Sequence, residues 1–537
     1  MKKILLSVLV LALGTFLILN LLIGKNEFQN NLPELKEKFA KKEKTSADHT
    51  KFTQLQKDFT RPQEVTAACI SCHNERHTEV MQTSHWNWER TEYIPGKGIK
   101  RVGKKNILNN FCIGIAGNEQ SCNKCHIGYG WNEPDFDFKD PTNVDCLACH
   151  DNSNEYMKQN SGAGMPDPSV NLAFVAQRVG KPQRENCGTC HFLGGGGNNV
   201  KHGDLETELF ATTRDIDVHM GIDASNLSCV DCHTAENHQM KGKVFSLSSM
   251  NKDRSECETC HSNLPHENPV LNEHTQKVAC QTCHIPLYAK ANPTKMTWDW
   301  STAGKLKDGK PYVELDEFGK EAYTSLKGNF TWAKNVEPEY IWFNGTASHY
   351  LLGDTLDPGQ TLQLNRLYGS YNDPMAKIIP VKIHRAKQIY DAEHKYLIQP
   401  KTVSNFEGDG GFWREFDWNR ASEEGMKRLN LPYSGSYDFV KTEMTWPLNH
   451  MVAPKEQSLA CADCHTRENS RLASLTDFYL PGRDYSPAVD TLGAGVIFFT
   501  ALGIITHAVA RIMKWRKKKE GNKVAAEKNE EQENEKS

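Results

Sequence analysis

The sequence has almost no excess charge of either sign. Its formal net charge at pH 7 is −3, from 64 Lys and Arg against 67 Asp and Glu. Domains that bind nucleic acid through its phosphates usually carry a basic face, and the composition gives no indication of one. The charge is an average over unlike segments and supports no inference of nucleic-acid binding, and no nucleic-acid partner is expected.

Cysteines outside a single pattern are also nearly absent. Of the 17 Cys, 16 fall in eight copies of C-x-x-C-H, and only Cys112 is left over. The motif residues are Cys69, Cys72 and His73; Cys122, Cys125 and His126; Cys146, Cys149 and His150; Cys187, Cys190 and His191; Cys229, Cys232 and His233; Cys257, Cys260 and His261; Cys280, Cys283 and His284; and Cys461, Cys464 and His465.

This spacing is typical of covalent haem attachment. Two thiols form thioethers with the porphyrin, and the following His binds the iron. Zinc sites also combine Cys and His, but zinc does not require the His directly after the second Cys. A disulfide framework is disfavoured because such closely spaced pairs are poor cross-links for a chain of this size. The sequence predicts eight covalently bound haem c groups.

The first seven motifs lie too close together for an ordinary side-chain core. Their first cysteines are separated by 53, 24, 41, 42, 28 and 23 residues. We therefore expect the haems to form much of the core as a stack. The predicted fold is a mainly α multihaem cytochrome c, with short helices and loops around the haems, few short strands, and one transmembrane helix at each end.

Long apolar runs occur only near the two ends, at 4–23 and 491–510, and each is long enough to cross a bilayer. A cleaved signal peptide is the alternative for the first run, although no A-x-A-like site follows it. Basic residues lie before the first run and at 511–519 after the second. By the positive-inside rule, both termini are predicted to be cytoplasmic, with the haem domain in the periplasm, at a bacterial inner membrane.

The expected organisation has six parts. They are a membrane anchor or signal segment at 1–24, a solvated stalk at 25–66, a seven-haem domain with the active-site haem at 67–284, a packing layer with the eighth haem at 285–485, a transmembrane helix at 486–513, and a cytoplasmic tail at 514–537, which is expected to be disordered over 520–537. In the packing layer, alternating runs such as 311–315 predict hairpin strands.

Each haem iron needs a ligand on its second face. Of 21 His, eight lie in motifs, His49 lies in the predicted stalk and His507 in an apolar run, which leaves eleven candidates. We predict distal iron ligands among His77, His85, His202, His219, His238, His384 and His450, with His266 and His274 in reserve.

Four successive glycines at 194–197 follow the fourth motif and lead into Asn198, Lys201 and His202. Because glycine has no Cβ, such a backbone can pass close to a large group. A flexible surface loop is the alternative. The polar residues that end the loop can converge on a haem face.

Several features together resemble the tetrathionate reductase family of octahaem c-type cytochromes, over about residues 65–470. They are the eight motifs with a long gap before the last, the loop G-G-G-G-N-N-V-K-H-G-D, the F-C-I around Cys112, and T-K-M-T-W-D-W at 294–300. The resemblance implies that the haem on the second motif is the active site and that Lys201 binds its iron. Cys112, Asn198 and a further lysine would line the substrate pocket, and Lys295 is the choice for that lysine, with Lys290 possible.

The resemblance implies a reductase that converts tetrathionate to thiosulfate with electrons relayed by haems with two His ligands. Its expected partners are the inner membrane, a quinol-linked or cytochrome electron donor, and a small inorganic anion. Hydroxylamine or nitrite reduction is one alternative, and nitrite is disfavoured because the sequence has no C-x-x-C-K. A non-catalytic, membrane-anchored electron carrier is the other. Members of the family are soluble periplasmic proteins, so the apolar runs depart from its pattern.

Overall fold

The computed structural model describes residues 28–40, 47–111, 114–242 and 249–534, in two compact units, 1–460 and 461–537. The helices of the first unit are α2 (Leu32–Ala40), α3 (Pro62–Cys72), α4 (Arg76–Met81), α5 (Ser84–Asn87), α6 (Glu119–Cys122), α7 (Leu147–His150), α8 (Leu172–Ala176), α9 (Arg184–His191), α10 (Cys229–Cys232), α11 (Pro269–His274), α12 (Cys280–His284), α13 (Phe412–Glu415) and α14 (Trp418–Arg428).

The strands all belong to the first unit as far as it is described. They are β1 (Arg90–Ile94), β2 (Gly98–Val102), β3 (Ala235–Glu236), β4 (Gln239–Met240), β5 (Thr294–Asp299), β6 (Val313–Leu315), β7 (Glu321–Thr324), β8 (Gly328–Ala333), β9 (Glu339–Phe343), β10 (Ala347–His349), β11 (Leu362–Gln363), β12 (Asn365–Leu367), β13 (Lys377–Asp391) and β14 (Tyr437–Pro447).

The haem motifs lie on short helical turns. In α10 and α12, for example, the two cysteines of a motif are three residues apart on one turn. Residues three apart in a helix share one face. The C-x-x-C spacing therefore presents both thiols to the same side, which is what attachment to a single porphyrin needs.

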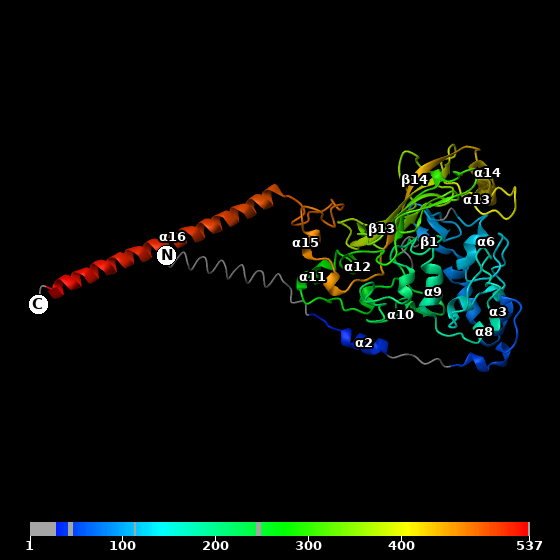
Figure 1. The fold of residues 1–537 in the computed structure, drawn as a ribbon, viewed down its shortest axis with the longest axis horizontal. Coiled ribbons are helices and arrows are strands. Elements are labelled where there is room, and N and C mark those ends of the chain that lie inside the picture. Colours follow the sequence, from blue (N-terminus) through cyan, green and yellow to red (C-terminus); the bar gives the residue numbers. More distant parts are fainter. Residues whose placement is uncertain (1–27, 41–46, 112–113, 243–248, 535–537) are drawn as a thin grey trace. The chain divides into compact units, whose positions relative to one another are not determined.

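An eight-stranded sheet lies beside these helices (Figure 1), and its strand β13 contacts α12. Its order is β11-β14-β13-β5-β8-β7-β6, and β9 also pairs with β13. β13 and β14 run antiparallel from the pair Val381 and Pro447 to the pair Asp391 and Tyr437. The hairpin predicted at 311–315 is confirmed, because β6 pairs with β7 antiparallel.

The prediction of a mainly α fold is wrong. The sheet and its covering helices have an apolar side-chain core of their own, which includes Trp298, Trp300, Phe330 and Trp446. β13 is rich in Ile and Val, which favour strands because their branched side chains pack well on a pleated surface. The close spacing of the haem motifs in the first half of the chain therefore did not predict the secondary structure of the second half.

One face of β13 holds two loops of the first half in place. Successive strand residues point to opposite faces, so Lys382 and Gln388 lie on the same side. The Lys382 ammonium donates to the carbonyls of Val200 and Lys201 at 3.0 and 3.1 Å. The Gln388 amide donates to the Asn109 carbonyl at 2.9 Å. The sheet thus fixes the loop that carries Lys201 and the loop before the second motif.

The segment predicted as a solvated stalk contacts the haem-motif region. Gln29 donates its backbone N–H to the Leu264 carbonyl at 3.2 Å, and its own carbonyl accepts from the Ser262 hydroxyl at 2.9 Å. Leu32, Leu35 and Phe39 line the same cavity as the motif cysteines. This part of the chain is therefore a wall of that cavity.

The second unit contains α15 (Cys461–Cys464) and α16 (Pro487–Asn534). Among the described residues, α16 is the one helix that is long and apolar enough to cross a membrane. The prediction of a membrane helix at each end is therefore not supported, nor is the cytoplasmic placement of both termini that depended on it. The run 4–23 lies outside the described residues. The prediction of disorder at 520–537 is also wrong for its described part, because α16 continues through 520–534.

Candidate haem and substrate sites

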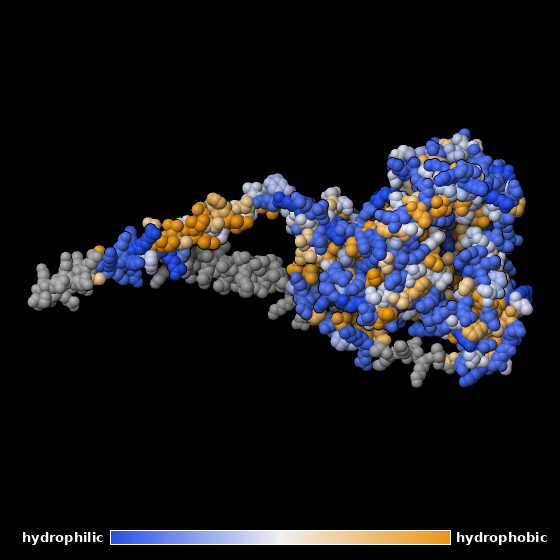
Figure 2. Space-filling view, viewed as in Figure 1, coloured by the Kyte–Doolittle hydropathy of each residue, from blue (hydrophilic) through white to orange (hydrophobic). Residues whose placement is uncertain are grey.

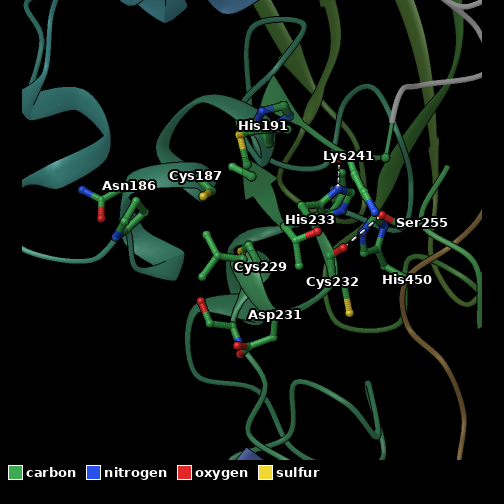
Figure 3. A pocket seen from close by; sticks show the side chains of 18 of the residues that line it. Asn186, Cys187, His191, Cys229, Asp231, Cys232, His233, Lys241, Ser255 and His450 are labelled. Carbon is green, nitrogen blue, oxygen red and sulfur yellow. Dashed lines mark hydrogen bonds between the residues drawn. The ribbon is translucent and has the colours of Figure 1, made fainter. Parts of the chain in front are cut away.

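A continuous cavity of about 3150 Å³ runs through the first unit. Cysteines from all seven motifs of that unit line it, together with most of their histidines. Figure 3 shows part of it, where Cys187, Cys229 and His233 come together from neighbouring helices. The cavity therefore lies where the sequence predicts that the haems are attached.

Histidine rings face one another in pairs across this cavity. Six motif histidines each have a second imidazole at a centroid distance between 6.1 and 6.3 Å. The pairs are His73 with His49, His150 with His238, His191 with His85, His233 with His450, His261 with His219, and His284 with His266.

These pairs fit a metal between the rings. With a metal–nitrogen bond of about 2 Å and about 1 Å from each nitrogen to its ring centre, two imidazoles on one metal have centroids about 6 Å apart. Rings packed directly on each other lie closer, as the 4.1 Å between Phe111 and His384 shows. Together with the hollow and the adjacent cysteine pairs, this spacing matches haem iron with a His ligand on each face.

The pairs include five of the histidines proposed as distal ligands, namely His85, His219, His238, His450 and the reserve His266. His49, which sequence reasoning assigned to the stalk, faces His73 instead. Its only sequence signal was its position shortly before the first motif. A ligand that arrives from a separate segment cannot be found by spacing alone.

The remaining candidates are placed differently. His202 lies edge-on to Trp446 at 4.8 Å. His384 is fully buried, and neither of its ring nitrogens has a hydrogen-bond partner; the buried Nδ1 of His77 has none either. His274 ends α11 and donates from Nδ1 to the Val270 carbonyl at 2.7 Å. Their roles as iron ligands stay predictions.

Outer contacts orient several of the paired rings. His150 and His233 donate from Nδ1 to the backbone carbonyls of Gly180 and Lys241 at 2.8 and 3.0 Å, and Figure 3 shows the second contact. His450 instead donates to the buried Asp204 carboxylate at 3.1 Å. Such a partner fixes the ring orientation and leaves Nε2 for the metal.

The second motif does not follow this arrangement. The Nε2 of His126 donates to the Trp86 carbonyl at 2.7 Å, and the ring has no exposed surface. Aromatic rings within 6.0 Å surround it, from Trp86, Trp88, Trp131, Phe136 and Phe138. Burial lowers the pKa of His126 to about 3, so the ring is neutral. His126 does not line the cavity, although Cys122 and Cys125 of the same motif do.

Lys201 lines the cavity where His126 does not. Its ammonium lies 4.8 Å from the centre of the Trp446 ring. The pKa of Cys125 is lowered to about 5, mainly by a hydrogen bond with Cys190 and further by positive charges that include Lys201. The lysine is therefore near the attachment site of the second motif.

The glycine-rich loop makes this position of Lys201 possible. Gly195 has a φ of +81°, and a Cβ there would lie 3.0 Å from a Val200 methyl and 3.2 Å from the Phe111 Cβ. A larger residue would be strained by its backbone conformation and would push the loop off Phe111. The alternative of a free surface loop is thus disfavoured by packing.

The other predicted pocket residues do not converge on this site. The Asn198 side chain accepts from the Thr207 backbone N–H at 2.9 Å. Lys295 is buried among Trp298, Phe330 and Trp332, and burial holds its pKa well below the ordinary value. Neither residue lines the cavity. The position of Cys112 lies outside the described residues.

Lys290, the other lysine considered, also points elsewhere. Its ammonium donates to the carbonyls of Asp215 and Ile216 at 3.2 and 2.9 Å. Sequence reasoning missed two polar residues that do line the cavity, Lys104 and Asn109. The Lys104 ammonium lies 3.8 Å from the centre of the Trp88 ring, beside His126. No motif marks either residue, so the sequence held no signal for them.

Thiols of different motifs also contact one another. The side chains of Cys125 and Cys190 are close enough to interact, as are those of Cys187 and Cys229. The fourth motif therefore touches the second through one of its cysteines and the fifth through the other. Haems held by thioethers at these cysteines would have their attached edges close together.

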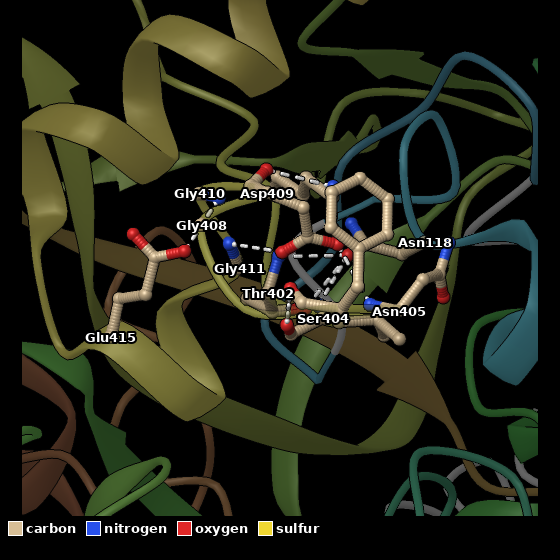
Figure 4. A network of polar contacts seen from close by, with 12 residues as sticks. Asn118, Thr402, Ser404, Asn405, Gly408, Asp409, Gly410, Gly411 and Glu415 are labelled. Atoms are coloured by element: carbon tan, nitrogen blue, oxygen red, sulfur yellow. Dashed lines mark hydrogen bonds and ion pairs between the residues drawn. The ribbon is translucent and has the colours of Figure 1, made fainter.

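A polar network ties the second motif to the sheet layer (Figure 4). Asn118, which precedes α6, accepts hydrogen bonds from the backbone N–H groups of Thr402 and Val403 at 2.8 and 3.0 Å. The loop after Thr402 is closed by the buried ion pair of Lys401 and Asp409 at 2.9 Å. The loop and the motif are therefore held as one piece.

Comparisons with known proteins agree with this arrangement. Residues 295–468 match the family described as cytochrome c bacterial, and residues 213–285 match cytochrome c7 and related cytochrome c. The chain is similar to the crystal structure of octaheme cytochrome c from Shewanella oneidensis, with 46% identity and a TM-score of 0.76, over 82% of this chain and 98% of that one. It is also 25% identical to an uncharacterized protein of Archaeoglobus fulgidus, over 36% of this chain and 80% of that protein.

Proposed function

Because the chain belongs to the octahaem cytochromes c and binds haem c covalently, we propose that it is a reductase whose active site is the second motif, with tetrathionate as substrate. The proposal is carried by one observation at the second motif, where Lys201 and not the motif histidine lines the haem cavity. His126 is committed to the Trp86 carbonyl, and Lys201 lies on the cavity instead. A site with an unusual iron ligand is suited to chemistry, whereas sites closed by two imidazoles are suited to electron transfer.

Lys201 must be neutral to bind iron. Removing its proton at pH 7 costs about 4–5 kcal/mol from an ordinary lysine pKa. Lys201 is half-buried on a cavity that Lys104 also lines, and desolvation and nearby like charge both disfavour an ammonium. Lys382 holds the backbone of Lys201 in place through two carbonyls. These residues supply a setting in which an amine ligand is feasible.

The proposed reaction takes two electrons. The central S–S bond of tetrathionate breaks, and two thiosulfate dianions form without a net change in protons. Bound haem supplies these electrons. Lys104 and Asn109 offer charge and an amide to the sulfonate oxygens. Cys112, in the F-C-I sequence before the second motif, is proposed to attack one central sulfur as the thiolate, which releases the first thiosulfate and leaves a Cys112–thiosulfate disulfide. The two electrons then cleave that S–S bond and restore the thiolate with release of the second thiosulfate.

The test is replacement of Lys201 by Ala. We expect turnover of tetrathionate with reduced viologen to fall at least a hundredfold, because the second haem loses its ligand. Low-temperature EPR of the oxidised protein should change in one centre only. The exposed Lys139 serves as the matched control, and Lys139→Ala should behave as wild type. Unchanged turnover in the Lys201 variant would refute the proposal.

The same samples separate the alternatives. Turnover of hydroxylamine in place of tetrathionate would keep the site but change its substrate. The helix α16 supports the alternative of a membrane-anchored electron carrier, because it is long and apolar enough to cross a membrane. Eight iron centres that respond to neither compound would support the carrier over any reductase.

A further inference from the structure

The eighth motif is fixed to the start of α16 by contacts within the second unit. His465 donates from Nδ1 to the Pro481 carbonyl at 2.7 Å. Gly482, at φ +84°, packs so close that a Cβ there would lie 2.7 Å from the His465 carbonyl oxygen. Arg483 donates to the carbonyls of Leu472 and Phe478 and pairs with Asp484. The segment 461–486 is thus folded back on its own haem motif.

An ion pair links the segment 461–486 to the first turn of α16. The Arg467 guanidinium lies 3.6 Å from the Asp490 carboxylate, which also accepts from the Ser486 backbone N–H at 2.8 Å. Arg467 is two residues beyond His465, and two residues span at most about 7 Å. Asp490 directly precedes the apolar run 491–510. The eighth motif therefore lies next to the point where α16 becomes apolar.

The dimensions of α16 match a bilayer. Its 20-residue apolar run is about 30 Å long, the thickness of the hydrocarbon core. Tyr485, two residues before α16, and Trp515 within it are both 62% exposed, and Trp515 lies about 42 Å along the helix from its first residue, Pro487. Exposed Tyr and Trp at this separation are typical of the two membrane interfaces. Figure 2 shows the apolar stretch of α16 followed by a hydrophilic band.

We infer that the module of residues 461–490 rests on the membrane surface and that the eighth motif is the port through which electrons from a quinol in the bilayer enter the protein. The quinol loses two electrons and two protons and becomes the quinone. The electrons reduce two ferric haem irons in turn, and the protons pass to water. This inference needs the haem assembly but does not depend on the substrate of the second motif.

The experiment lifts the port from the membrane without changing any of its residues. Twelve Gly and Ser residues are inserted between Asp484 and Tyr485 of the full chain, which adds a flexible spacer of about 20 Å. The control carries the same insertion between Lys519 and Glu520, beyond the apolar run. Both proteins and the wild type are placed in lipid nanodiscs that contain a long-chain menaquinol, and haem reduction is followed by the α-band absorbance.

Electron tunnelling rates fall exponentially with distance. We therefore expect the 484/485 insertion to slow reduction by the quinol at least tenfold, while the 519/520 insertion reduces at the wild-type rate. Dithionite should reduce all three proteins fully, which shows that their haems are intact. If the first variant lacks haem, Arg467→Ala with Asp490→Ala replaces it. Equal rates in all proteins, or no reduction of the wild type by the quinol in pure lipid, would overturn the inference.

Discussion

At the scale of single residues, the carboxylate of Asp204 distinguishes one iron site from its neighbours. It is 2% exposed and accepts from the ring of His450 and from the backbone N–H groups of Asn449 and His450. A carboxylate partner makes the imidazole more electron-rich than a carbonyl partner does, which favours the ferric state. The haem of the fifth motif is thus predicted to have a lowered reduction potential.

The prediction is tested with Asp204→Asn. Loss of about 1 kcal/mol of differential hydrogen bonding corresponds to an upward shift of about 40 mV for a one-electron couple. We expect one component of a spectroelectrochemical titration to move by this amount, with the other components unchanged. The exposed Asp215 provides the control variant Asp215→Asn. A shift of several haems together would point to a general structural change instead.

What the sequence could predict at this scale was the covalent chemistry. The C-x-x-C-H spacing is local, so all eight attachment sites were readable. The resemblance to a known family pointed to the second motif as the exception, but the placement of the His126 ring was not readable, because the aromatic rings that enclose it come from positions 86 to 138 and meet only in the fold. Lys104 and Asn109 were missed for the same reason, because no sequence motif includes them and only the fold places them on the cavity.

At the scale of elements, the loop that ends at Gly411 depends on one buried carboxylate. Burial raises the pKa of Asp409, but hydrogen bonds from Lys401 and from the Asn405 backbone outweigh it and hold the pKa well below the ordinary value. A carboxylate with a lowered folded-state pKa stabilises the fold above the unfolded-state pKa of about 3.9. That stabilisation is lost as pH falls below this value toward the folded-state pKa.

We therefore expect the thermal midpoint of the wild type to fall more steeply below about pH 4 than that of Asp409→Asn, which is less stable at pH 7 but flatter in acid. The exposed Asp308, also in a turn, gives the control Asp308→Asn, whose acid curve should follow the wild type. Parallel curves for the wild type and Asp409→Asn would show that this carboxylate does not titrate with unfolding.

The sheet layer shows where sequence reasoning failed among elements. Motif spacing described the first half well, but residues 285–460 contain no motif, and their strands pair over long distances, such as β5 with β13. Local alternation revealed the hairpin of β6 and β7 because its partners are adjacent. The central strands needed partners that no local pattern identifies.

At the scale of the whole molecule, the six facing pairs fall into two classes of ring geometry. The planes are nearly parallel in His266 with His284, His49 with His73 and His233 with His450, at 8°, 26° and 27°. They are steep in the other three, at 62°, 71° and 78°. Parallel planes separate the iron d orbitals more than crossed planes do.

The oxidised protein should therefore show both kinds of low-spin EPR signal, rhombic signals from the first class and strongly axial, low-field signals from the second. Replacing His266 with Met should remove one rhombic component, and replacing His85 with Met should remove one axial component. A spectrum with one kind of signal alone would contradict the ring orientations. The EPR of whole cells can report the same pattern.

The contacts of the fourth motif have a kinetic consequence. Cys190 touches the second motif and Cys187 touches the fifth, so electrons from the fifth motif can reach the proposed active site through a single neighbour. Cleavage of one S–S bond needs two electrons, and both must be present on adjacent centres when the substrate is bound. When few haems are reduced, turnover should therefore rise with the square of the fraction of reduced haems. Halving that fraction would lower the rate about fourfold.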